Sequence, residues 1–117
     1  MQPREPRLFL EDIDTAISDI LEFTTGGPTE FFESAMVQAA VIRQFEIIGE
    51  AVRNLPEELL AREPEIVWSD AVRMRNRIAH GYFSVDLGIV WDTIDNDLPQ
   101  LRAAVRRLLQ DLDSEDT

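Results

Sequence analysis

The final third of the chain carries the pattern that most restricts the fold. From about Asp86 onward, large apolar residues recur at alternating steps of four and three positions: Leu87, Trp91, Ile94, Leu98, Leu101, Val105, Leu108 and Leu112. This spacing places one apolar seam along a helix, and a seam of this length needs other helices to pack against it. Pro99 falls inside the pattern, so we expect a kink there.

Two further long segments show helical periodicity. Residues 8–23 place apolar residues at helical spacing with acidic residues between them, and the glycines and proline at 24–28 end that helix. Thr29 is suited to cap a long second helix that runs to about Asn54. This helix is apolar on more than one face, so we expect it to be buried on two sides. Its polar stripe consists of Arg43, Glu46, Glu50 and Arg53.

Shorter helices complete the expected fold. One is predicted between the prolines at 56 and 64, and another from Ser69 or Asp70 to Gly81, which is expected to take a left-handed conformation. No segment is a convincing strand. The sequence therefore predicts a single all-α domain over residues 1–117, an up-and-down bundle of four to five helices, with a disordered acidic tail from about residue 111.

Composition narrows the class of protein. The chain has no cysteine and one histidine, His80, so we expect no thiolate or multi-histidine metal site. No segment has the pattern of a secretory signal or a membrane span, and we expect a cytoplasmic protein without a membrane partner. The net charge of -12, from 23 acidic and 11 basic residues, argues against broad, non-specific binding to a polyanion.

The arginines are unevenly distributed. The segment AVRMRNRIAHGYFSV holds Arg73, Arg75 and Arg77 and not one Asp or Glu. On a helical wheel at about 100° per residue, Arg75 falls among apolar residues, whereas the other two lie on the polar side. A guanidinium in that position needs a partner or a cleft. A structural ion pair between Arg75 and either Glu46 or Glu50 is about as well supported as a purely catalytic role for this arginine.

His80 has notable neighbours in the same segment. Asn76 lies one helical turn earlier and can orient the imidazole ring or contact a phosphate. Tyr82 follows two residues later, where it is either an aromatic anchor after the helix end or a participant in the chemistry. Arg75 and His80 lie about 140° apart on a regular helix, so their side chains converge only if the helix loosens at Gly81 or if two subunits share one cleft.

Arg75, His80 and Tyr82 match an Arg-x4-His-x-Tyr motif, and through it the chain resembles the HepT-like toxins of the HEPN superfamily of helical ribonucleases. The resemblance extends in order through LEDIDTAISDILEFTTG, VIRQFEIIGEAVRNLP, PEIVW and YFSVDLGIVWDTIDNDLPQL, and so covers about residues 8–109. It implies a HEPN-type homodimer that is a metal-independent endoribonuclease without a cofactor. Such proteins are typically the toxins of type II toxin-antitoxin systems.

The resemblance also implies roles for single residues. Arg75 and His80 are the expected catalytic pair, with Asn76 as an orienting residue and Arg73 and Arg77 as RNA contacts. Cleavage by attack of the RNA's own 2'-hydroxyl needs a base, an acid and positive charge near the phosphorane, and a cleft shared by two subunits supplies each catalytic residue twice. RNA is the expected substrate, and DNA is not an expected partner.

The expected antitoxin is a minimal nucleotidyltransferase, which in this family can transfer AMP to the motif tyrosine, here Tyr82. Two other interpretations stay open. One is a non-catalytic HEPN subunit that binds a nucleotidyltransferase, because an acidic surface suits a protein partner better than a nucleic acid. The other is a structural dimer that has lost its activity.

Overall fold

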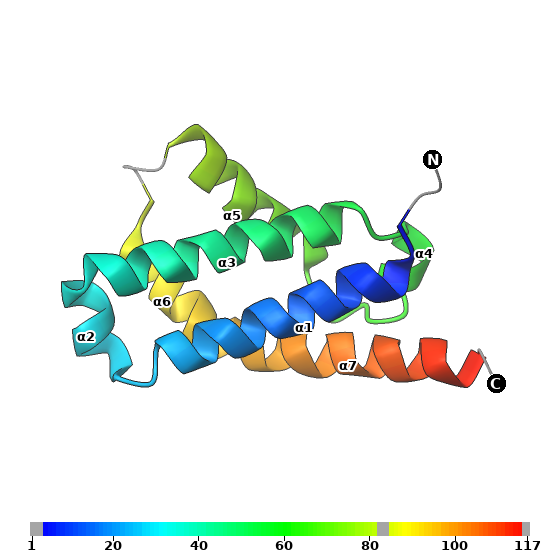
Figure 1. Cartoon of the computed structure of the whole chain (residues 1–117). Helices are drawn as coiled ribbons and strands as arrows, with labels where there is room; N and C mark the ends of the chain where they lie inside the picture. The colour runs from blue at the N-terminus through cyan, green and yellow to red at the C-terminus, as the bar shows by residue number, and fades with distance from the viewer. Residues whose placement is uncertain (1–3, 82–84, 116–117) are drawn as a thin grey trace.

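The computed structural model describes residues 4–81 and 85–115, and every regular element within them is helical. Three long helices, α1 (Pro6–Phe23), α3 (Ala35–Arg53) and α7 (Leu98–Glu115), run along the length of the molecule (Figure 1). α1 packs against both α3 and α7, and α5 (Trp68–His80) packs on α3. The chain direction alternates from α1 to α3, α5 and α7 (Figure 1). The all-helical prediction is confirmed.

α3 lies at the centre of the bundle. Its residues Val41, Phe45, Ile48 and Val52 are buried, and it contacts α1 on one side and α5 on another. The prediction of a helix buried on two sides is therefore confirmed. The core is completed by fully buried residues of the other long helices: Leu10, Ile13, Ile17 and Ile20 of α1, and Leu98, Val105 and Leu108 of α7. Each such side chain contributes about 1.5–3 kcal/mol by leaving water.

The long second helix is divided in two. α2 (Gly27–Glu33) ends at Ser34, which has an extended backbone and whose Oγ accepts a hydrogen bond from the backbone N–H of Val37 at 3.2 Å. The prediction that Thr29 caps one continuous helix was wrong, because Ser34 is the cap of α3 and Thr29 lies inside α2. The change of direction at Ser34 allows α2 to bury Phe31 completely in the core.

The final helical segment is also divided. Asp86 caps α6 (Leu87–Asp92), its Oδ1 accepting from the backbone N–H groups of Gly88 and Ile89. A π-helical turn (Thr93–Asp97) then leads directly into α7. The kink expected at Pro99 therefore takes the form of a π-helical turn just before this residue. Proline has no backbone N–H, so it cannot continue the regular hydrogen-bond pattern of an α-helix.

Two predicted helix ends differ from the structure. Gly81 has φ -163°, an extended value that any residue adopts, so the predicted left-handed conformation was wrong. α7 continues to Glu115, so residues 111–115 are not the disordered tail that was expected. This last turn is held by ion pairs from the neighbouring segments, Arg62 with Glu115 at 2.7 Å and Arg7 with Asp113.

The connection between α3 and α5 contains the short helix α4 (Glu57–Leu60), which confirms the helix expected between the two prolines. Within residues 4–81 and 85–115, no helix has both the length and the apolar character that a membrane span requires.

Candidate functional site

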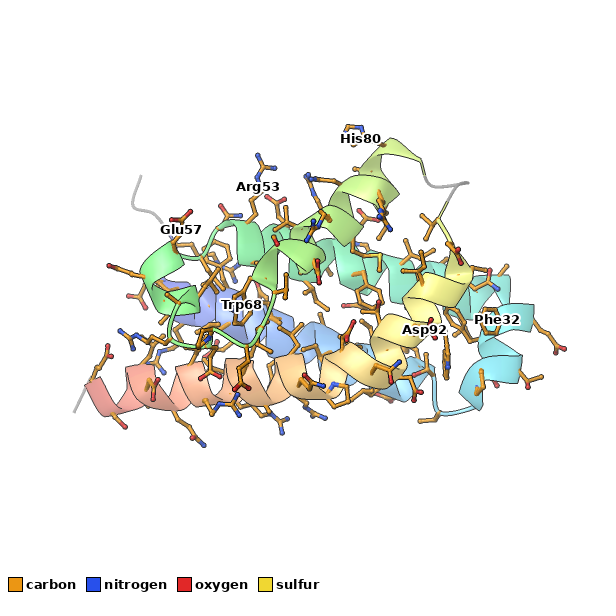
Figure 2. The ribbon with its side chains drawn as sticks, turned by 180° about the vertical axis from the view of Figure 1, so that it is seen from behind. Phe32, Arg53, Glu57, Trp68, His80 and Asp92 are labelled. Carbon is orange, nitrogen blue, oxygen red and sulfur yellow. The ribbon has the colours of Figure 1, made fainter. Side chains whose placement is uncertain are left out.

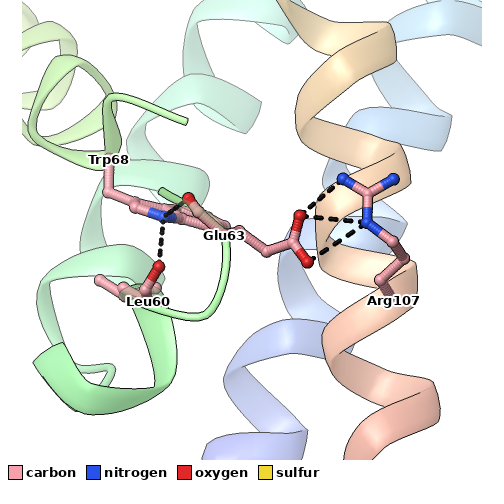
Figure 3. A network of polar contacts seen from close by, with 4 residues as sticks. All are labelled: Leu60, Glu63, Trp68 and Arg107. Atoms are coloured by element: carbon pink, nitrogen blue, oxygen red, sulfur yellow. Dashed lines mark hydrogen bonds and ion pairs between the residues drawn. The ribbon is translucent and has the colours of Figure 1, made fainter. Parts of the chain in front are cut away.

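α5 carries the motif residues and is anchored at its first residue. The Trp68 side chain is mostly buried, and its indole N–H donates to the carbonyl oxygens of Leu60 at 3.1 Å and Glu63 at 3.3 Å (Figure 3). The Glu63 carboxylate in turn accepts hydrogen bonds from Arg107 of α7 and raises the pKa of that guanidinium. The start of α5 is thereby connected to α4 and α7, although no side chain caps it.

Gly49 sets the distance between α5 and α3. A Cβ atom at this position would overlap the Cβ of Arg75 and would lie 2.7 Å from the carbonyl oxygen of Ala71. The two helices therefore approach each other closely where α5 carries Arg75. Sequence reasoning did not identify this role, and the available signal was an isolated glycine within an apolar helix.

Arg75 is held by neighbours of the same chain. Its Nη2 lies 3.2 Å from Oε2 of Glu50, the residue after Gly49, and its Nη1 donates to Oδ1 of Asn76 at 3.2 Å. The Arg75 side chain is 30% exposed, so the guanidinium stays accessible to a ligand. It borders a space of about 290 Å³, the Arg75 hollow, which is lined also by Arg4, Phe9, Asp12, Arg43, Glu46, Ile47, Glu50 and Ala51. Of the two acids considered as partners, Glu50 is the one that pairs.

His80 is the last residue of α5 and points away from the bundle (Figure 2). It borders a second space of about 480 Å³, the His80 hollow, which is lined also by Met74, Arg77, Gly81, Val85, Asp86 and Ile89. In the described part of the chain, no side chain hydrogen-bonds to the imidazole ring. Asn76 contacts Arg75 instead, so its role in orienting His80 stays a prediction.

Arg75 and His80 do not meet within one chain. They border separate hollows, and α5 is regular up to His80, so the helix does not loosen before its end. The two side chains therefore face directions that differ by roughly the 140° expected for this spacing. One chain brings together Arg75, Asn76 and Glu50, and presents His80 separately beside Arg77.

The two predicted RNA contacts differ in their surroundings. Arg73 pairs with Asp70 at 2.6 Å and donates to the Ser69 hydroxyl at 3.3 Å. Arg77 has no ion-pair partner among the described residues, and it borders the His80 hollow. Arg77 is thus the more available of the two for a phosphate.

Two further expectations concern Tyr82 and metals. Tyr82 lies outside the described residues, so its modification stays a prediction. Among residues 4–81 and 85–115, no group of three or more His, Asp or Glu residues is arranged to hold a metal ion.

By its fold and its candidate site, this protein belongs to the class of small helical bundles that display an arginine–histidine motif on one helix. Comparison with known proteins specifies the family. The family model described as "Ribonuclease HepT-like" matches residues 13–108. The chain therefore belongs to the HepT-like ribonuclease family, as the motif indicated.

Similar proteins occur in archaea. The chain is 42% identical over 106 residues to "Probable ribonuclease HepT" of Thermococcus cleftensis, covering 90% of this chain and 96% of the relative. It is 36% identical over 117 residues to "Putative RNase MJ0127" of Methanocaldococcus jannaschii, covering 99% of this chain and 97% of the relative. No solved structure gives a significant match.

Proposed function

We propose that this protein is a metal-independent endoribonuclease that cleaves RNA by attack of its own 2'-hydroxyl. The observation that carries the proposal is the Arg75–His80 motif on an accessible helix of a HepT-like ribonuclease. The imidazole of His80 transfers protons, and the guanidinium of Arg75 stabilises the charge of the phosphorane. Because the nucleophile belongs to the RNA, the mechanism uses no metal-activated water and no cofactor. DNA lacks the 2'-hydroxyl and is not a substrate.

The active unit in this proposal is a homodimer whose two chains share one cleft. Two observations support it. Arg75 and His80 border separate hollows within one chain. Among the described helices, α3 is the only one that α5 packs against extensively, so the exposed side of α5 that carries Asn76 and His80 is available to a second copy. A two-fold axis beside α5 provides two imidazoles, one as the base and one as the acid.

Single substitutions test the catalytic proposal. His80→Ala and Arg75→Ala should each reduce RNA cleavage at least about a hundredfold, in line with the usual contribution of a general acid or base. Arg53→Ala is the matched control, because Arg53 is an exposed arginine of α3 that borders neither hollow (Figure 2). Cleavage should persist in EDTA and leave 2',3'-cyclic phosphate ends. Loss of all cleavage in EDTA, restored by a divalent metal, would contradict the mechanism.

Light scattering combined with mixed dimers tests the shared cleft. The protein should be a dimer at micromolar concentration. Mixing wild-type protein with an excess of His80→Ala chains should remove most of the cleavage, because a mixed dimer then has only one imidazole in the shared cleft and lacks either the base or the acid. A monomeric protein with full activity would refute the shared cleft.

In the cell, we propose that the protein is the toxin of a type II toxin-antitoxin pair, located in the cytoplasm and neutralised by a minimal nucleotidyltransferase that transfers AMP to Tyr82. The position of Tyr82 directly after Gly81, which borders the His80 hollow, supports this. Added phosphate would occupy arginines that otherwise receive RNA. Intact-mass measurement after co-expression should show an AMP-sized increment that the Tyr82→Phe chain lacks.

A second candidate function is a non-catalytic subunit that binds a nucleotidyltransferase. The net charge of -12 favours it, as do the carboxylate partners of Arg73 and Arg75. Purified protein that forms a stable complex with the nucleotidyltransferase but leaves every RNA intact would support this function over the first.

A further inference from the structure

A cavity outside the Arg–His motif lies between α5 and the α6–α7 segment. Its volume is about 390 Å³, within the range of roughly 300–1,000 Å³ that is usual for small-ligand sites. Much of its lining is apolar: Phe45, Ile48, Ile66, Val67, Trp68, Met74, Ile89, Leu98 and Leu101. We call it the α5–α7 cavity. It shares Met74, Arg77 and Ile89 with the His80 hollow, so the two spaces adjoin along one face of α5.

The α6–α7 side of this cavity presents hydrogen-bond acceptors. The Thr93 hydroxyl donates to the carbonyl of Ile89 at 2.9 Å, which leaves its oxygen free to accept. Gln100 donates through its amide nitrogen to the carbonyl of Asn96, which leaves its amide oxygen available. The Asp97 carboxylate has no ion-pair or side-chain hydrogen-bond partner among the described residues and can only accept. A ligand that fits this side must bring donors.

The α5 side of the cavity presents a positive charge. Arg73 and Arg77 both line it, but Arg73 is already paired with Asp70. Arg77 is the available cation, and it lines the His80 hollow as well. A ligand that bridges the two sides would therefore have an apolar body, N–H donors on one edge and a negative group near α5.

We propose that the α5–α7 cavity is a nucleobase subsite, which rests on the ribonuclease function proposed above. It takes an RNA base with an exocyclic amino group (adenine, cytosine or guanine) whose adjacent phosphate binds Arg77 beside His80. The amino group donates to the acceptors of Thr93, Asp97 and Gln100. Uracil has no amino group and turns carbonyl oxygens toward these acceptors, so it is disfavoured. The subsite would make cleavage selective for the base next to the cleaved phosphate.

Binding measurements test the subsite without relying on cleavage. Calorimetric titration of the unmodified protein with cytidine 3'-monophosphate and uridine 3'-monophosphate should give affinities that differ about tenfold in favour of cytidine. Asp97→Asn replaces a pure acceptor with a group that also donates, and should reduce the difference to about twofold or less. Asp95→Asn is the matched control, because Asp95 belongs to the same π-helical turn but does not line the cavity. It should keep the wild-type difference.

Cleavage of an RNA with one randomised position provides the second test. Wild-type and Asp95→Asn proteins should cut next to amino-bearing bases about ten times more often than next to uracil. The Asp97→Asn protein should lose this selectivity and cut next to all four bases with frequencies that differ by about twofold or less.

Four outcomes decide the proposal. Equal binding of the two nucleotides by wild-type protein would overturn it, as would the same loss of selectivity in both Asp variants. Conversion of a dimer to a monomer by Asp97→Asn would assign the cavity to a subunit contact and also overturn it. If the protein binds the two nucleotides selectively through Asp97 but cleaves no RNA, the base site is supported. Only the proposed ribonuclease function is then contradicted.

Discussion

Replacing Gly49 with alanine tests the contact that holds the motif helix against α3. The new methyl group would overlap the Cβ of Arg75 and approach the carbonyl oxygen of Ala71 to 2.7 Å. Overpacking of this kind costs about 1–3 kcal/mol, and we expect about 2–3 here because a backbone carbonyl cannot rotate away. The higher helix propensity of alanine offsets about 0.5–1 kcal/mol. The free energy of unfolding should therefore fall by about 1–2.5 kcal/mol.

Urea denaturation followed by circular dichroism measures this loss, and the melting temperature should fall by roughly 5–10 °C. Ala39→Gly is the control, because Ala39 is an exposed residue of the same helix and reports helix propensity alone. Both substitutions should destabilise, although they change helix propensity in opposite directions. The reasoning fails if Gly49→Ala is as stable as wild type or more stable, since the two helices would then have room for a side chain.

Three other predictions follow from contacts described above. Ser34→Ala should lower the free energy of unfolding by about 1 kcal/mol because it removes the cap of α3, whereas Thr29→Ala should change it by less than about 0.5 kcal/mol, as urea denaturation of both would show. Trp68→Phe should lower it by about 1 kcal/mol through loss of the indole hydrogen bonds, and a value equal to wild type would show that they contribute nothing. Glu50→Gln should change it by less than about 1 kcal/mol, since the pair with Arg75 is partly exposed; a loss above about 2 kcal/mol would indicate a more buried pair.

The long helices could be predicted from the sequence because their apolar spacing reports burial directly. The helix expected at 8–23 corresponds to α1 (Pro6–Phe23), and the apolar faces expected on α3 are buried. The interruption at Ser34 was missed because the apolar pattern continues across it and Thr29 is also a residue type that caps helices. The turn at Ser34 accompanies the burial of Phe31 in the folded core, which the apolar pattern alone does not indicate.

The candidate site was only partly predictable. The motif identified α5 and its arginines, because that segment combines the only histidine with three arginines and no acid. The choice of Glu50 over Glu46 as the partner of Arg75 depends on how two helices cross, which residue spacing within one helix does not determine. The same holds for Gly49, whose role exists only where α5 approaches α3. The α5–α7 cavity likewise joins residues that range from Phe45 to Leu101 in the chain, from elements that no local pattern relates.

Because α5 packs mainly on one long helix, much of its surface lies outside the core, which affects how the family's members can diverge. Arg73, Asn76 and Arg77 are exposed, so substitutions at these positions disturb few contacts of the buried core. Changes of this kind usually alter folding stability by less than about 0.5 kcal/mol. Under the proposed function, related chains can therefore change their RNA contacts without losing their fold, much as antibody loops vary on a constant framework. In this protein, the part that can vary on a constant framework is the exposed side of a helix, α5.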